Sequence, residues 1–223
     1  MSRNTAKARN TACTRAVSMH RVVVALLVAL GISACATTAS TRAPARIEIE
    51  NAVGFTIIEE ARISNDIRLD YDAALDLLEQ GRLDEGIAML ERVAETAPEL
   101  SAPRIDLGIA YHRAGRLEDA ETQLQLAIAT NNNHPIAHNE MGILHRKAGR
   151  FAEAKASYES ALAIYPGYHF ARRNLAVLCD LYLVDLSCAL ENYEAYMATV
   201  PEDSEATMWI ADIRNRMGQQ ESL

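Results

Sequence analysis

The chain has few of the residues that build sheets and irregular loops. Its 223 residues include 10 glycines and 6 prolines, and only 5% are aromatic. Strands favour β-branched and aromatic side chains, whereas this sequence is rich in alanine. Hydrophobic residues nonetheless make up 49% of the chain, which is enough for a sizeable core. The composition therefore predicts a mostly helical protein.

The chain also lacks an apolar run of about 20 residues, the length that crosses a membrane as a helix. The best candidate, residues 22–32, is interrupted by Gly31, and it follows a stretch with five basic residues and no acidic one. A basic stretch, a short apolar core and then small residues are the layout of a secretory signal. The sequence therefore predicts an export signal in residues 1–34 and not a spanning helix.

The residues after the apolar run resemble the bacterial lipobox. Ile32, Ser33 and Ala34 supply one aliphatic and two small side chains before Cys35. The resemblance implies cleavage before Cys35 and lipid attachment to its thiol as diacylglycerol and palmitate, which anchors the chain without spanning the bilayer. A plain signal peptide with an incidental cysteine is the alternative. Because inner-membrane lipoproteins usually carry aspartate after the cysteine, Ala36 implies the outer membrane of a Gram-negative cell, facing the periplasm.

Basic charge is scarce once the signal is removed. Residues 1–34 hold five basic residues and no acidic one, so their loss changes the net charge from −8 to −13. A nucleic-acid partner requires a basic face, and so does binding to anionic lipid. We therefore expect no nucleic-acid partner, and contact with the membrane only through the N-terminal lipid.

The sequence repeats itself with an offset of 34 residues. Segments that begin at Gly81, Gly115 and Gly149 align as GRLDEGIAMLERVAETAP, GRLEDAETQLQLAIATNN and GRFAEAKASYESALAIYP. This period of paired helices resembles the tetratricopeptide repeat, or TPR. The resemblance implies an all-α, right-handed superhelical solenoid of antiparallel helix pairs, because one pair alone cannot bury its apolar face. The repeats are predicted at about 67–100, 101–134, 135–168 and 169–203.

The repeat pattern also implies specific contacts in each hairpin. The glycines at the turns should close the first helix of each repeat with a positive φ. Gly108 and Gly142 should let that first helix approach the second one at Ala120 and Ala154, respectively.

The ends of the repeat region are less regular. The fourth unit fits only if one extra residue precedes Ala189, in a turn without glycine. Residues 204–218 read as an amphipathic closing helix, and 204–223 are assigned as a cap and tail. Thr56 and Glu59 form a capping-box pattern that predicts a longer first helix. The TPR domain is therefore predicted to span 56–203, after a lipidated tether at 35–55.

Two cysteines remain free in this scheme, because Cys13 leaves with the signal and Cys35 carries lipid. Cys179 and Cys188 flank the irregular fourth turn and would reside in an oxidising compartment. A disulfide requires Cα atoms within about 7 Å. A pair of buried thiols that pack as small apolar residues is the alternative, and the sequence leaves both open.

The sequence contains no recognisable catalytic motif: no nucleophile elbow, phosphate-binding loop, Ser-x-x-Lys or paired-cysteine metal spacing. His134 and His138 have a spacing that could share a metal, with His145 and His112 nearby. However, His134 precedes a proline in a predicted turn, and His145 occupies a packing position that is usually tyrosine. We therefore expect no enzyme activity, no cofactor and no metal.

The resemblance implies that the protein binds a partner through the first helices of its repeats, which line a concave groove in TPR proteins. In this chain the groove positions form an aliphatic strip with a basic edge, suited to an extended or helical peptide with apolar anchors. The alternative is that Arg146, Lys147 and Arg173 are simply solvated surface residues. The positions are Arg68, Tyr71, Leu75, Leu78, Glu79, Ile105, Ile109, His112, Arg113, Ile136, Asn139, Ile143, Arg146, Lys147, Phe170, Arg173, Val177 and Asp180. The carboxylate clamp of chaperone-binding TPR domains is not expected, since its positions fall on Tyr71, Leu75 and Asp106.

These features together predict a non-enzymatic lipoprotein adaptor for an envelope machine. The layout resembles TPR lipoproteins that assemble pilus secretins, although this chain has fewer repeats. A regulatory subunit of a cell-wall enzyme or of an energised transport system is an alternative, as is a structural role near peptidoglycan. We expect a protein or peptide partner and no small-molecule substrate.

Overall fold

The computed structural model describes residues 46–48, 56–58 and 63–220. The predicted signal, Cys35 and Ala36 lie outside these residues. The helices of the described part are α2 (Asn65–Glu79), α3 (Leu83–Thr96), α4 (Ala102–Arg113), α5 (Leu117–Thr130), α6 (Pro135–Lys147), α7 (Phe151–Ile164), α8 (His169–Leu178), α9 (Leu186–Met197) and α10 (Ser204–Gln220). A short π-helical turn, η2 (Cys179–Leu183), follows α8.

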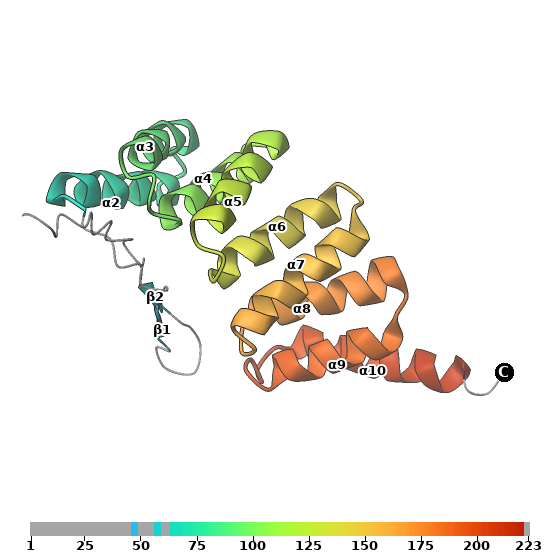
Figure 1. The fold of residues 1–223 in the computed structure, drawn as a ribbon. Coiled ribbons are helices and arrows are strands. Elements are labelled where there is room, and N and C mark those ends of the chain that lie inside the picture. The colour runs from blue at the N-terminus through green and yellow to red at the C-terminus, as the bar shows by residue number, and fades with distance from the viewer. Residues whose placement is uncertain (1–45, 49–55, 59–62, 221–223) are drawn as a thin grey trace, which may run out of the picture. The chain divides into compact units, whose positions relative to one another are not determined.

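The helices form four antiparallel pairs that stack in sequence order, so the predicted TPR solenoid is confirmed (Figure 1). We call α2, α4, α6 and α8 the A helices, and α3, α5, α7 and α9 the B helices. Each A helix packs against the B helix that follows it, and each B helix packs against the next A helix. In addition, α4 contacts α6 and α6 contacts α8, so these A helices share one layer.

Glycine forms the turn between the A and B helices of the first three repeats, as predicted. Gly81, Gly115 and Gly149 have φ values of 76°, 78° and 74°. The next residue donates its N–H back to the helix, as Arg116 does to the Tyr111 carbonyl at 2.9 Å. This is the bonding of a Schellman motif. A Cβ atom at these glycines would meet nothing within 4 Å, so the backbone conformation, and not space, requires glycine.

A second set of glycines brings the two helices of a repeat together. A Cβ atom on Gly108 would lie 2.8 Å from Leu124 Cγ, and one on Gly142 would lie 2.5 Å from Tyr158 Cε1. The tightest contacts therefore involve Leu124 and Tyr158, one turn beyond the predicted Ala120 and Ala154. Both of those alanines are fully buried.

The fourth repeat absorbs its extra residue in η2. The wider π turn ends at Val184, which has a φ of 54° and takes the place that glycine holds in the other turns. Cys179 and Cys188 are bonded as a disulfide with their Cα atoms 5.8 Å apart. Asp185 caps α9 by accepting the Cys188 N–H at 3.0 Å.

The helix α10 closes the C-terminal end of the stack, as predicted. Ile213 is fully buried in the core shared with α8 and α9. The Trp209 ring lies 5.4 Å from the Tyr193 ring. Asp203 starts the helix by accepting the N–H groups of Glu205 and Ala206, each at 3.0 Å.

The start of the domain differs from the prediction. Thr56 does not begin a helix: it opens strand β2 (Thr56–Ile58), which pairs antiparallel with β1 (Arg46–Glu48). The β-branched run at 56–58 favours a strand over a helix. The first helix begins at Asn65, where Ser64 accepts the Ile67 N–H at 3.3 Å as the N-cap.

Candidate functional site

The candidate site is the surface of the A helices that faces away from the B helices, which we call the A-helix face. Most of the predicted groove residues have exposed or half-buried side chains there. They are Arg68, Tyr71, Leu75, Glu79, Ile109, His112, Arg113, Ile136, Ile143, Arg146, Lys147, Phe170, Arg173, Val177 and Asp180.

Three predicted groove residues are not available at this surface. Ile105 and Asn139 are each only 2% exposed, and Leu78 is 8% exposed. Ile105 and Leu78 belong to the hydrophobic core, where the Leu78 side chain lies against Gly86. The prediction that these three residues offer binding surface is therefore wrong, because neighbouring helices cover them.

Asn139 is buried because it links two A helices. Its side-chain carbonyl accepts from Asn174 Nδ2 at 2.9 Å, and its own amide donates to Glu140 at 3.0 Å. Between the first and second repeats, the Tyr71 hydroxyl of α2 donates to the Asp106 carboxylate of α4. Both links join residues 35 positions apart, which is one repeat plus one residue. The pairs α2–α4 and α6–α8 are thus each joined by a polar contact at the same 35-residue separation.

Three contacts around the fourth repeat join residues that are 36 positions apart, because this repeat contains one extra residue. Arg146 donates to the Tyr182 hydroxyl at 3.3 Å. The guanidinium of Arg173 lies 5.3 Å from the Trp209 ring centroid. Asp180 forms an ion pair with Arg216 of α10. Arg173 and Asp180, which the sequence placed in the groove, are therefore partly engaged by the closing helix.

Two acidic groups in this layer are poorly solvated. Burial raises the pKa of the Asp106 carboxyl, and the hydrogen bond from Tyr71 partly offsets that rise. Burial likewise raises the pKa of Glu140, against the hydrogen bond from Asn139. Ionisation of either carboxyl group in the folded protein therefore costs free energy. Neither group forms an ion pair with a cationic side chain among the described residues.

Basic groups gather at the C-terminal ends of α4 and α6. His112 has its pKa lowered by burial and by the positive charges of Lys147 and Arg146, so the three groups lie close together. No carboxylate in the described part of the chain forms an ion pair with Arg113, Arg146 or Lys147. The Nε2 atom of His112 is buried without a hydrogen-bond partner.

Several other arginines of the described residues are ion-paired. Arg82 and Arg116 each bind a carboxylate three residues along the chain, at 2.5 and 2.7 Å. Unpaired basic groups on a strongly acidic protein form a site that can accept an anionic group. Half-buried Ile109 and Ile143 lie on the same two helices and supply an apolar surface beside it.

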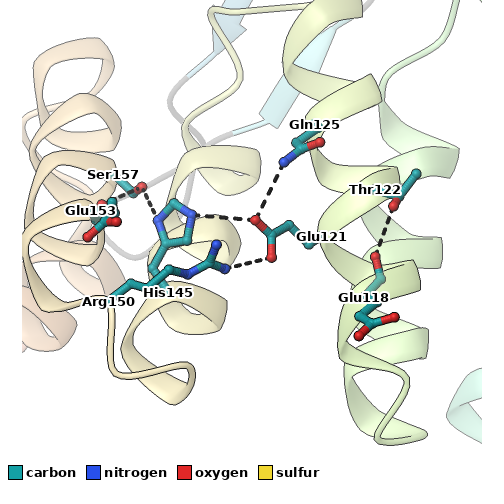
Figure 2. A network of polar contacts seen from close by, with 8 residues as sticks. All are labelled: Glu118, Glu121, Thr122, Gln125, His145, Arg150, Glu153 and Ser157. Atoms are coloured by element: carbon teal, nitrogen blue, oxygen red, sulfur yellow. Dashed lines mark hydrogen bonds and ion pairs between the residues drawn. The ribbon is translucent and has the colours of Figure 1, made fainter.

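The histidines singled out in the sequence serve local packing. His145 Nδ1 lies 3.2 Å from Ser157 Oγ, and its Nε2 lies 3.9 Å from the Glu121 carboxylate (Figure 2). Glu121 also accepts from Arg150 at 2.6 Å, which lowers the pKa of its carboxyl. This network ties α5 to α6 and to the start of α7, as Figure 2 shows.

The remaining histidines lie in the turn between α5 and α6 and in the first turn of α6. His134 is buried at the N-cap of α6, and His138 Nε2 lies 3.0 Å from the Asn132 carbonyl. Within residues 63–220 there is no group of three His, Cys, Asp or Glu side chains arranged to hold a metal ion. None of the helices in that range is long and apolar enough to cross a bilayer.

Comparison with known proteins agrees with the repeat assignment. Family models described as tetratricopeptide repeat match residues 70–140 and 135–168. No curated protein sequence matches the chain significantly. Residues 70–168 are therefore tetratricopeptide repeats by sequence as well as by fold.

Solved structures show the same fold at low sequence identity. MamA (residues 41 to the end) from Desulfovibrio magneticus RS-1 has a TM-score of 0.62 at 19% identity, over 72% of this chain and 90% of that one. PilF of Pseudomonas aeruginosa has a TM-score of 0.62 at 17% identity, over 69% of each chain. The first TPR domain of Spaghetti (RPAP3), bound to the HSP90 peptide SRMEEVD, has a TM-score of 0.50 at 19% identity, over 53% of this chain and 93% of that one.

Proposed function

We propose that this chain is a lipid-anchored adaptor of the bacterial envelope whose A-helix face binds a segment of a protein partner. The partner belongs to an envelope assembly, of which a pilus or secretin machine is the best candidate. The protein has no catalytic role in this proposal. It holds its partner at the periplasmic side of the outer membrane.

One observation carries the binding role: three basic residues without an ion pair to a described carboxylate lie on the same two helices as the half-buried Ile109 and Ile143, namely Arg113, Arg146 and Lys147. An apolar strip with adjacent cations fits a peptide that combines apolar anchors with carboxylates. TPR domains commonly bind proteins, and the RPAP3 domain binds an HSP90 peptide that contains two glutamates and an aspartate. The present chain lacks the clamp residues at the equivalent positions, so its cations would act from different sites.

The envelope location is supported by the N-terminal sequence alone. The basic stretch, the apolar run and the lipobox-like Ile32–Cys35 segment predict export and lipidation, and Ala36 favours the outer membrane. Two acyl chains anchor a protein stably, since each buried CH₂ contributes about 0.8 kcal/mol.

Metabolic labelling with palmitate tests the anchor. Wild-type protein should incorporate label and fractionate with the outer membrane, whereas Cys35→Ala should lose both. Retention of label by the variant, or its unchanged membrane fractionation, would exclude lipidation at this cysteine.

Substitution on the A-helix face tests the binding surface. Ile109→Glu or Arg146→Glu should abolish co-purification of the partner from cells, with the helical circular dichroism and the Tm nearly unchanged. Leu126→Glu on α5 is the matched control, because Leu126 is also an exposed apolar residue, at 43%. If only the Leu126 variant weakens the complex, the A-helix face is not the binding surface.

A further inference from the structure

The turn that follows the fourth A helix, α8, carries an exposed apolar surface, residues 181–184, which we call the apolar tip. Leu181 is 64% exposed and Val184 is 70% exposed, and Tyr182 and Leu183 between them are exposed as well. The first three turns, residues 79–82, 113–116 and 147–150, contain charged residues, glutamine, alanine and glycine, and no large apolar residue. The repeat architecture therefore does not require an apolar turn here.

The tip is held in a conformation that is unfavourable for its residues. Val184 adopts a φ of 54°, a left-handed conformation that is unfavourable for an L-residue and that β-branched residues rarely adopt. The π turn before it is a feature often found at functional sites. The Asp185 N–H bonds to the Cys179 carbonyl at 2.9 Å, and the disulfide fixes Cys179 to Cys188. Strain and apolar exposure in one segment indicate use in binding.

Tyr182 connects the tip to the A-helix face. Its hydroxyl accepts from Arg146 at 3.3 Å, and the Arg146 guanidinium lies 5.7 Å from the centroid of its ring. The Phe151 ring packs against the Tyr182 ring, with the two ring centroids 4.9 Å apart. The tip is thus continuous with the basic cluster at the end of α6.

We propose that the apolar tip is one end of the binding surface and receives a bulky apolar side chain of the partner segment, whose carboxylates face Arg146 and Lys147. This inference rests on the proposed function, in which the A-helix face binds a protein segment. The positive charges of Arg146 and Lys147 favour a partner segment that carries carboxylates. Neither cation has an acidic partner in the part of the chain that the structure describes. A bilayer is disfavoured as the occupant, since the mature chain is strongly acidic and anionic lipid repels it.

A defined peptide probe tests the tip. The probe is an end-labelled synthetic peptide that alternates glutamate with leucine and phenylalanine, titrated with the protein purified from cells and followed by fluorescence anisotropy. One control peptide has lysine for each glutamate, and another has serine for each apolar residue. The wild-type protein should bind the first peptide and neither control.

Variants of the tip complete the test. Leu181→Asn and Val184→Gly should each weaken binding of the peptide about tenfold, the effect expected for anchor residues of an interface. Leu126→Asn is the control on a distant exposed leucine and should bind normally. Val184→Gly should also keep or raise the Tm, because glycine tolerates the left-handed conformation. Loss of binding in that variant therefore cannot result from unfolding.

Two results would overturn the inference. The first is unchanged peptide affinity in both tip variants; if Arg146→Gln still weakened binding, the A-helix face would remain the site without the tip. The second is binding of the wild-type chain to vesicles of phosphatidylethanolamine and phosphatidylglycerol that is lost in Leu181→Asn. That outcome would identify the tip as a membrane contact.

Discussion

Gly142 shows how single residues set the distance between the two helices of a repeat. Its position lies inside α6, where alanine is usually favoured over glycine by about 1 kcal/mol. Here the Tyr158 ring occupies the space that a side chain would need. Tyr158 is itself fully buried, so it has little room to move.

Gly142→Ala should therefore destabilise the protein, although the substitution favours the helix. Overpacking of a core typically costs about 1–3 kcal/mol, more than the gain in helix propensity. Gly218→Ala is the control, since Gly218 lies in α10 with nothing within 4 Å of a Cβ atom, and it should raise stability slightly. Urea unfolding measures both variants. Equal stabilisation of the two would contradict the close approach at Tyr158.

Glu140 gives a second prediction at the residue scale. Burial raises its pKa in the folded state above the unfolded value of about 4.3. Between those two pKa values the folded protein binds more protons than the unfolded chain, so stability falls as the pH rises through that window. The penalty is complete above the folded-state pKa and absent below the unfolded one.

Glu140→Gln should accordingly raise the free energy of unfolding at neutral pH and give no such gain in acid. The glutamine carbonyl can still accept the hydrogen bond from Asn139. Denaturant melts across the acidic to neutral range measure the difference between variant and wild type. A gain that stays constant over that range would mean that ionisation of Glu140 is not its source.

The fourth hairpin is the element that departs most from the repeat. Its sequence predicts the irregularity, because the glycine is missing and one residue is inserted before Ala189. It does not predict that the insertion becomes a π turn or that a valine takes the left-handed position. Those outcomes depend on how Cys179 and Asp185 bond across the turn.

Removal of the disulfide tests how this element is held. Cys188→Ser should lower the free energy of unfolding by about 2–3 kcal/mol, the range for a short closed loop. Reductant should bring the wild type to the same stability and leave the variant unchanged. Mass spectrometry of the unreduced protein, alkylated after denaturation, should find neither Cys179 nor Cys188 modified. Alkylation of both cysteines would show that the bridge is absent.

At the scale of the whole molecule, the sequence predicts the repeats well because their signals are local. Glycine at a 34-residue spacing ends the first three A helices by its own backbone preference, whatever surrounds it. Burial of a side chain, in contrast, depends on residues from neighbouring repeats. Ile105 and Asn139 occupy groove positions in the repeat pattern, yet the neighbouring repeats cover them. The engagement of Asp180 by Arg216 likewise depends on how α10 docks.

The same distinction applies to strand β2. The capping-box pattern at Thr56 and Glu59 was a local signal for a helix, but β1 pairs with residues 56–58 from ten residues upstream. Pairing of this kind depends on a second segment, which no single motif reveals.

The central claim is that the A-helix face binds a partner in the envelope. Photo-crosslinking in living cells tests it most directly, with a photoreactive residue placed at Ile143 on α6 or at Leu126 on α5, both at the surface or partly exposed. Mass spectrometry then identifies the adducts. The account predicts one envelope protein crosslinked from Ile143 and none from Leu126. Adducts from Leu126 alone, or the same adducts from both positions, would contradict it.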